Sequence, residues 1–179
     1  MSFFKNHFRM VMTCILAFCL SLIMATSAIF IANLNFTIPL LVRNWGTVFL
    51  VIMITGFLCP LTQWSFALCD KLKIKPGTLA HDLIDDLVAS LIFNSAATFV
   101  MAAVNIFGNA EIEAAVAAGA LPSVQAVYWS TVLHDWPITF VISYIVAFFV
   151  MKIAERIAVK AAGPPAGMPA PACAGEAGE

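Results

Sequence analysis

Charged side chains are scarce in this sequence. Only 11% of its 179 residues are Asp, Glu, Lys or Arg, whereas 62% are hydrophobic and the mean hydropathy is +0.97. A soluble domain of this length cannot bury so much apolar surface, which argues against a water-soluble globular protein. The composition therefore predicts a chain that has the lipid bilayer as its solvent and its main partner.

Charge is absent altogether from four long stretches of the chain. They lie between Arg9 and Arg43, between Arg43 and Asp70, between Asp86 and Glu111, and between Asp135 and Lys152. A helix needs roughly 20 apolar residues to cross the hydrocarbon core of a bilayer. We therefore predict an all-α, integral membrane four-helix bundle with spans at residues 10–34, 46–68, 87–107 and 136–151. The last span is short, and we expect Lys152 and Trp136 to anchor its two ends at the interfaces.

Basic residues are nearly absent from one side of this predicted bundle. With four spans, Arg43 is the single basic residue on that side. The other eight fall on the opposite side: Lys5, Arg9, Lys71, Lys73, Lys75, Lys152, Arg156 and Lys160. Because cytoplasmic segments are rich in Lys and Arg, the asymmetry predicts that both termini lie in the cytoplasm. These residues are the ordinary flanks of spans, so no nucleic-acid partner is expected.

The sequence also lacks the patterns of redox and catalytic sites. No Cys-x-x-Cys pair occurs, and Cys14, Cys19, Cys59 and Cys69 fall in the predicted cytoplasmic half, where thiols stay reduced. No nucleophile–base pair or metal-ligand constellation is recognisable. We therefore expect no enzymatic activity, no cofactor and no bound metal.

A signal peptide is an alternative interpretation of the N-terminus. Lys5 and Arg9, an apolar run and the small residues ATSA that end at Ala28 resemble such a peptide. The apolar run continues to Leu34, however, which makes it long enough to span the membrane. We favour a spanning helix that stays in the protein.

Two stretches of the sequence resemble each other: NWGTVFLVIMITGF, from Asn44, and DWPITFVISYIVAF, from Asp135. Aligning their Trp residues, 91 positions apart, also pairs Phe49 with Phe140, Ile54 with Ile145 and Phe57 with Phe148. A second similar pair, SLIM at Ser21 and SLIF at Ser90, is 69 positions apart. These pairs predict two like-oriented transmembrane hairpins, which form a parallel internal repeat.

The repeat divides the chain into segments. We predict a cytoplasmic N-terminus at 1–9, hairpins at 10–68 and 87–160, a cytoplasmic loop at 69–86, and a disordered tail at 161–179. The second hairpin has an enlarged outer loop at 108–135, whose alanine-rich stretch 110–118 favours a short helix outside the membrane.

Small residues recur on one face of the first and third predicted spans. Ser21, Ala25, Ala28 and Ala32 correspond, through the repeat, to Ser90, Asn94, Ala97 and Met101. Small side chains let helices approach closely in lipid, so we expect both spans to face the bundle interior. The Asn94 amide needs a hydrogen-bond partner there, and contact with a substrate is the alternative role.

Two pairs of polar residues lie near predicted span ends. His81 and Asp85 are one helical turn apart and could contribute to a divalent metal site, but one His with carboxylates lacks the ligands of a zinc site. Thr78 with these acids is more typical of a helix start. His134 and Asp135 are expected at the outer interface as a solvated pair, with a ligand or proton-linked role as the alternative.

The first hairpin resembles a family of bacterial membrane hairpins classed as domain of unknown function 2798. The resemblance rests on LIMATSAIFIANLNFTIPLLVRNWGTVFLVIMITGFLCPLTQ: small residues at 21–28, Asn33, Phe36 with Pro39, Trp45, and Pro60 ahead of Lys71. In the second hairpin Asn105 and Trp136 fit, but Met151 stands where a Pro is expected. The resemblance implies a small inner-membrane protein and supplies no activity or catalytic residues.

Two classes of function remain open. We favour a non-enzymatic structural or partner-binding membrane component that assembles with a membrane-protein partner, or as a homo-oligomer through the small-residue face. The alternative is a small transporter or exporter subunit for a neutral or hydrophobic solute, because many transport folds are built from repeats. Proton-coupled transport is disfavoured because we find no carboxylate, Lys or His at mid-membrane depth.

Overall fold

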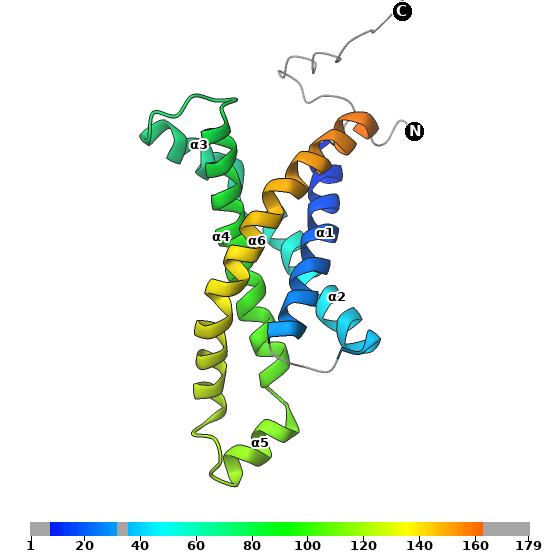
Figure 1. Ribbon diagram of the computed structural model, residues 1–179, viewed down its shortest axis with the longest axis vertical. Coiled ribbons are helices and arrows are strands. Elements are labelled where there is room, and N and C mark those ends of the chain that lie inside the picture. Colours follow the sequence, from blue (N-terminus) through cyan, green and yellow to red (C-terminus); the bar gives the residue numbers. More distant parts are fainter. Residues whose placement is uncertain (1–7, 32–35, 163–179) are drawn as a thin grey trace, which may run out of the picture.

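The computed structural model describes residues 8–31 and 36–162, and they form six helices. Figure 1 shows their arrangement: α1 (Phe8–Ile31), α2 (Ile38–Leu58), α3 (Leu61–Lys71), α4 (Leu79–Ile106), α5 (Ala110–Ala117) and α6 (Val124–Ala162). Four of them, α1, α2, α4 and α6, are long and apolar enough to cross a membrane. The predicted all-α four-helix membrane bundle is therefore confirmed. Ala32 and most of the predicted N-terminal segment and tail lie outside the described residues.

The four long helices pack in a ring. α1 packs against α2 and α6, and α4 packs against the same two helices from the other side. The first and third spans therefore lie diagonally across the bundle, and both present their small residues to α2 and α6. α3, the beginning of α1 and the end of α6 lie at one end of the bundle, and α5 lies at the other (Figure 1). The short helix predicted in the outer loop is confirmed by α5.

The second span differs from its predicted bounds of 46–68. α2 begins earlier, at Ile38, where Thr37 caps the helix by accepting a hydrogen bond from the Leu40 N–H at 3.4 Å. It ends at Leu58, because Pro60 has no N–H to continue the helix and restricts Cys59 to an extended conformation. The chain beyond the break forms the separate helix α3, so Arg43 and Asn44 belong to a span and Trp64 does not.

The third and fourth spans are longer than predicted. α4 begins at Leu79, and the Thr78 hydroxyl accepts a hydrogen bond from the His81 N–H at 3.3 Å, which confirms the helix start expected there. α6 begins at Val124, so Pro137 lies inside the helix and not in its first turn, where the predicted span of 136–151 would place it. A proline inside a helix removes one backbone hydrogen bond and bends the axis. Figure 1 shows α6 changing direction in its yellow part.

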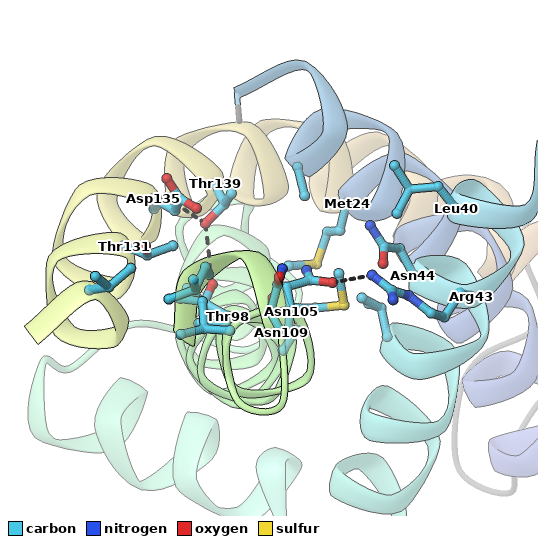
Figure 2. Close-up of a pocket in the computed structure, with 18 residues that line it drawn as sticks. Met24, Leu40, Arg43, Asn44, Thr98, Asn105, Asn109, Thr131, Asp135 and Thr139 are labelled. Carbon is cyan, nitrogen blue, oxygen red and sulfur yellow. Dashed lines mark hydrogen bonds between the residues drawn. The ribbon is translucent and has the colours of Figure 1, made fainter. Parts of the chain in front are cut away.

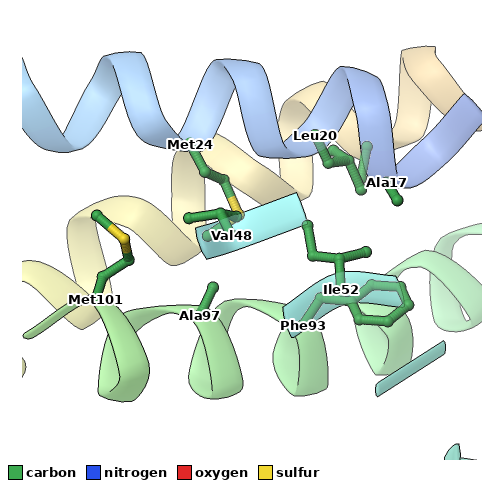
Figure 3. Packing of buried hydrophobic residues seen from close by; sticks show 9 residues of the cluster. Ala17, Leu20, Met24, Val48, Ile52, Phe93, Ala97 and Met101 are labelled. Carbon is green, nitrogen blue, oxygen red and sulfur yellow. The ribbon is translucent and has the colours of Figure 1, made fainter. Parts of the chain in front are cut away.

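The apolar core joins all four long helices (Figure 3). Its buried members are Ala17, Leu20 and Met24 of α1, Val48 and Ile52 of α2, Phe93, Ala97 and Met101 of α4, and Ala147 of α6. Small residues alternate with large ones, which lets the helices interdigitate. Gly56 serves the same purpose, since a Cβ atom there would lie only 3.1 Å from Thr13 Cγ2.

The buried small-residue face predicts a specific response to enlargement. Ala25 is fully buried in α1, so Ala25→Leu should lower the free energy of unfolding by about 1–3 kcal/mol through overpacking. Ala126, which is exposed on α6, provides the matched control as Ala126→Leu. Reversible unfolding of the purified variants in mixed detergent micelles measures both changes. Equal losses in the two variants would contradict the packing described here.

Candidate functional site

A cavity of about 420 Å³ lies between the four long helices in the half of the bundle nearer α5, and we name it the outer cavity after the side that the charge pattern predicts for α5. Figure 2 shows how its polar side chains are arranged: Arg43 and Asn44 of α2 on one side, Thr131, Asp135 and Thr139 of α6 on the other, and between them Thr98 and Asn105 of α4 and Asn109, the N-cap of α5. Apolar residues such as Met24, Val48 and Met101 form the floor. This mixture of an apolar wall and a few polar groups is typical of small-molecule sites.

The Arg43 side chain is held in place across the bundle. Its Nη2 donates a hydrogen bond to Asn105 Oδ1 at 2.5 Å, which joins α2 to the outer end of α4 (Figure 2). A guanidinium has five N–H donors, so this contact leaves others free to bind an acceptor in the cavity. Arg43 thus gives the cavity a fixed positive charge.

Asn44 gives the cavity a hydrogen-bond acceptor without a protein donor. The residue is only 1% exposed, and its Oδ1 atom has no partner among the described residues. Leaving a buried polar atom unsatisfied costs about 1–3 kcal/mol, so such atoms are normally retained for a ligand or an ordered water. Asn44 therefore brings to the lining of the cavity a buried acceptor whose donor is missing among the described residues.

The opposite wall brings a carboxylate to the cavity. Asp135 is paired with its neighbour, with Oδ1 2.8 Å from His134 Nδ1, and its side chain is 23% exposed while that of His134 is 67% exposed. Below it, the Thr139 and Thr98 hydroxyl oxygens lie 3.4 Å apart. We expected both members of this pair to be solvated. The His134 side chain is exposed to solvent, whereas Asp135 lines the cavity.

A smaller cavity of about 220 Å³, which we name the inner cavity, lies in the other half of the bundle. Its lining includes Thr13, Gly56 and Asp85. The core cluster lies between the two cavities, with Val48 and Ala97 facing the larger one and Ile52 and Phe93 facing the smaller one. One apolar layer therefore separates the two cavities, which lie in opposite halves of the bundle.

The predicted small-residue face is buried as expected. Ser21, Ala25, Ser90 and Ala97 are buried, while Ala28 is half-buried and borders the cavity. Asn94 is fully buried, and its Nδ2 donates a hydrogen bond to the Trp136 carbonyl at 3.2 Å, which is the partner in the bundle that we predicted. The indole N–H of Trp136 donates in turn to the Ser95 hydroxyl at 3.0 Å. These two hydrogen bonds join α4 to α6.

His81 and Asp85 have structural neighbours at the α3 end of the bundle. The His81 ring packs against Phe66 of α3 with 5.0 Å between ring centroids, and Asp85 lies on the same face of α4. In the described parts of the chain, no three His, Cys, Asp or Glu side chains come together in a way that could hold a metal ion. Burial raises the pKa of the nearby Cys69 thiol, and Asp85 and Asp70 add to the shift, so this thiol is a poor nucleophile.

Several residues of interest were missed by the sequence interpretation. Arg43 was placed between two spans and Asp86 at the cytoplasmic flank of the third. Asp86 is instead fully buried inside α4, one position before the predicted start of the third span at residue 87. The missing signal was Thr78, whose capping role starts α4 two turns earlier than hydropathy indicated.

No family model, no curated protein and no solved structure matches this chain. The geometry of the cavity is therefore the basis for any statement about its role.

The Asn94 contact predicts a measurable contribution to stability. Asn94→Ala removes the hydrogen bond to the Trp136 carbonyl, and we expect it to lower the free energy of unfolding by about 0.5–2 kcal/mol. Gln63, an exposed amide on α3, is the control as Gln63→Ala. The same micelle unfolding assay measures both variants, and an Asn94→Ala loss no larger than that of the control would show that the amide does not join the helices.

Proposed function

We propose that this chain is a multi-pass protein of the bacterial inner membrane that binds a small neutral or zwitterionic solute as part of a transport system, without enzymatic activity. The observation that carries the proposal is the outer cavity with the buried, unpartnered Asn44 amide oxygen on its wall. Of the two functional classes, solute handling explains this cavity, whereas a purely structural role does not require it.

The size and charge of the cavity support this class of solute. A volume of about 420 Å³ falls within the usual range for ligand pockets, roughly 300–1,000 Å³. Arg43 and Asp135 bring one positive and one negative charge to opposite sides. A zwitterion would satisfy both groups, and a neutral polar solute would bind without charge imbalance.

The two cavities support transport in particular. In a carrier, a central site opens alternately to the two faces of the membrane around a fixed binding region. Here the core layer of Val48, Ile52, Phe93 and Ala97 separates a larger outer cavity from a smaller inner one. Rearrangement of this layer would connect the two.

Homo-oligomerisation through the small-residue face loses its support. Ser21, Ala25, Ser90 and Ala97 are covered by helices of the same chain, so this face is not open to a second copy. The internal repeat and the family resemblance stay predictions. α1 packs against α2 and α4 packs against α6, as two hairpins would, but α1 also packs against α6 and α2 against α4.

The orientation in the membrane rests on the distribution of basic residues. Lys71 and Lys75 near α3, and Lys160 near the end of α6, belong to the end of the bundle that we place in the cytoplasm, while Arg43 belongs to the other end. The outer cavity would then face the periplasm.

Topology can be tested with two exposed positions. In a chain whose native cysteines are replaced by Ser, we expect Lys75→Cys to react with a membrane-impermeant maleimide only in inverted vesicles. Glu113→Cys on α5 should react only in intact spheroplasts. Reaction of both cysteines from one side would overturn the orientation.

Solute binding can be tested with purified protein in nanodiscs. We expect amino acids, betaines or neutral sugars to raise the melting temperature, and calorimetry to give the affinity of those that do. Because Asn44 contributes one buried hydrogen bond, Asn44→Ala should weaken binding about tenfold, and Arg43→Gln by at least as much.

The control is Arg156→Gln, which removes an exposed charge from α6 far from the outer cavity and should leave the affinity unchanged. If no neutral or zwitterionic solute binds, or if the two cavity variants bind as tightly as the control, the proposed function is wrong.

A further inference from the structure

Asp86 is a buried acid that belongs neither to the apolar core nor to the lining of the outer cavity. It lies in α4, is 0% exposed, and neither of its carboxyl oxygens has a hydrogen-bond partner among the described residues. The neighbouring acids on the helix differ: Asp82 is paired with Lys152 of α6, and Asp85 is partly exposed to the inner cavity.

No free cation faces Asp86 from the helices packed around α4 in the described structure. Two polar side chains of α6 lie on this side. The Tyr144 hydroxyl donates to the Leu83 carbonyl at 3.4 Å, and Lys152 forms an ion pair with Asp82. On the α3 side lies Cys69, near Asp85 and Asp70. The one cation of α2 is Arg43, and its side chain is bound to Asn105 at the opposite end of α4. The remaining charge beside Asp86 is that of Asp85, which is of the same sign.

An ionised carboxylate is very costly in such surroundings, because no cation replaces the water that it loses and the neighbouring Ser90 hydroxyl offers a single donor at most. Uptake of a proton removes the charge and therefore most of the cost. We propose that Asp86 is a proton-binding site and that its proton exchanges with the outer cavity along a row of buried polar side chains in α4.

That row follows one face of α4 at intervals of four residues: Asp86, Ser90, Asn94 and Thr98. All four are buried, and Ser90 Oγ and Asn94 Oδ1 have no hydrogen-bond partner in the described structure. Thr98 meets Thr139 of α6 at 3.4 Å, and both line the outer cavity. At helical rise the row covers about 18 Å.

The Ser90 and Thr98 hydroxyls can pass a proton through water molecules between them by successive hydrogen bonds, while the Asn94 amide oxygen accepts a hydrogen bond from this row without carrying the proton. In each step one O–H bond breaks as another forms, so Asp86 releases H⁺ to water in the outer cavity and becomes a carboxylate, and the reverse step neutralises it. In a transporter of the kind proposed above, this exchange would make proton uptake at Asp86 the partner reaction of solute movement. That coupling rests on the proposed function, whereas proton binding by Asp86 does not.

Infrared spectroscopy of the full chain in nanodiscs tests the proton site without any solute. At neutral pH we expect a carbonyl stretching band of a protonated carboxylic acid, which Asp86→Asn removes and Asp86→Glu retains at a shifted frequency. Asp70→Asn, at an exposed acid on α3, should leave the band unchanged. A circular dichroism spectrum like that of the wild type shows that each variant is folded. Absence of the band in the wild type, or its survival in folded Asp86→Asn, would overturn the proposal.

The route to the outer cavity is tested by transfer of the wild-type protein into D₂O, where exchange of the acid proton shifts the same band. We expect Thr98→Val to slow this exchange at least tenfold. Thr26→Val, which removes a hydroxyl bonded within its own helix α1, should leave the rate unchanged. Exchange at the wild-type rate in Thr98→Val would exclude the row as the route. Failure of every solute to bind would refute the proposed function and leave both infrared results intact.

Discussion

The structure depends on one constraint: hydrocarbon offers no hydrogen-bond partner, so polar groups at that depth must be satisfied within the protein. Helices satisfy the backbone, and the four long helices turn apolar side chains such as Phe30, Leu50, Ile54 and Phe149 outward. Several polar side chains of the spans point inward: Ser21, Asn44, Asn94, Thr98, Thr139 and Ser143 are all buried. The interior of the bundle therefore combines an apolar core with buried polar groups that need partners inside the protein.

The contact between α4 and α6 shows how this constraint is met in detail. Pro137 lacks an N–H, so one carbonyl of α6 loses its backbone donor and the helix bends. At the same level the Trp136 carbonyl accepts from Asn94 Nδ2 at 3.2 Å, and the Thr139 hydroxyl lies 2.8 Å from the Asp135 carbonyl. Side chains of both helices thus donate hydrogen bonds to α6 carbonyls within one turn of Pro137. Of these residues, Asp135 and Thr139 also line the outer cavity.

Polar groups gathered inside a bundle also create places where they are not fully satisfied. Asn44 and Asp86 are the two clearest cases, one on the wall of the outer cavity and one toward the opposite end of α4. An unsatisfied buried group costs stability, and proteins retain such groups where a ligand or a proton completes the site. The two proposals made here assign a solute to the first group and a proton to the second.

The sequence by itself determined the solvent of this protein, the number of spans and the presence of the outer helix. These follow from the spacing of charges and from local composition, because a span needs only enough consecutive apolar residues, wherever its neighbours lie. Local rules also placed Thr78 at a helix start and Ser21, Ala25, Ser90 and Ala97 on buried faces. Only the tertiary structure decided which polar residues meet. Arg43 and Asn105 are 62 positions apart, and periodicity assigns each to a helix face without saying which helix that face touches. Asp86 was misplaced for a related reason. Hydropathy takes every charged residue as the end of a span, so it put Asp86 outside the third span. Packing of α4 against α6 and α3 nevertheless buries this carboxyl group.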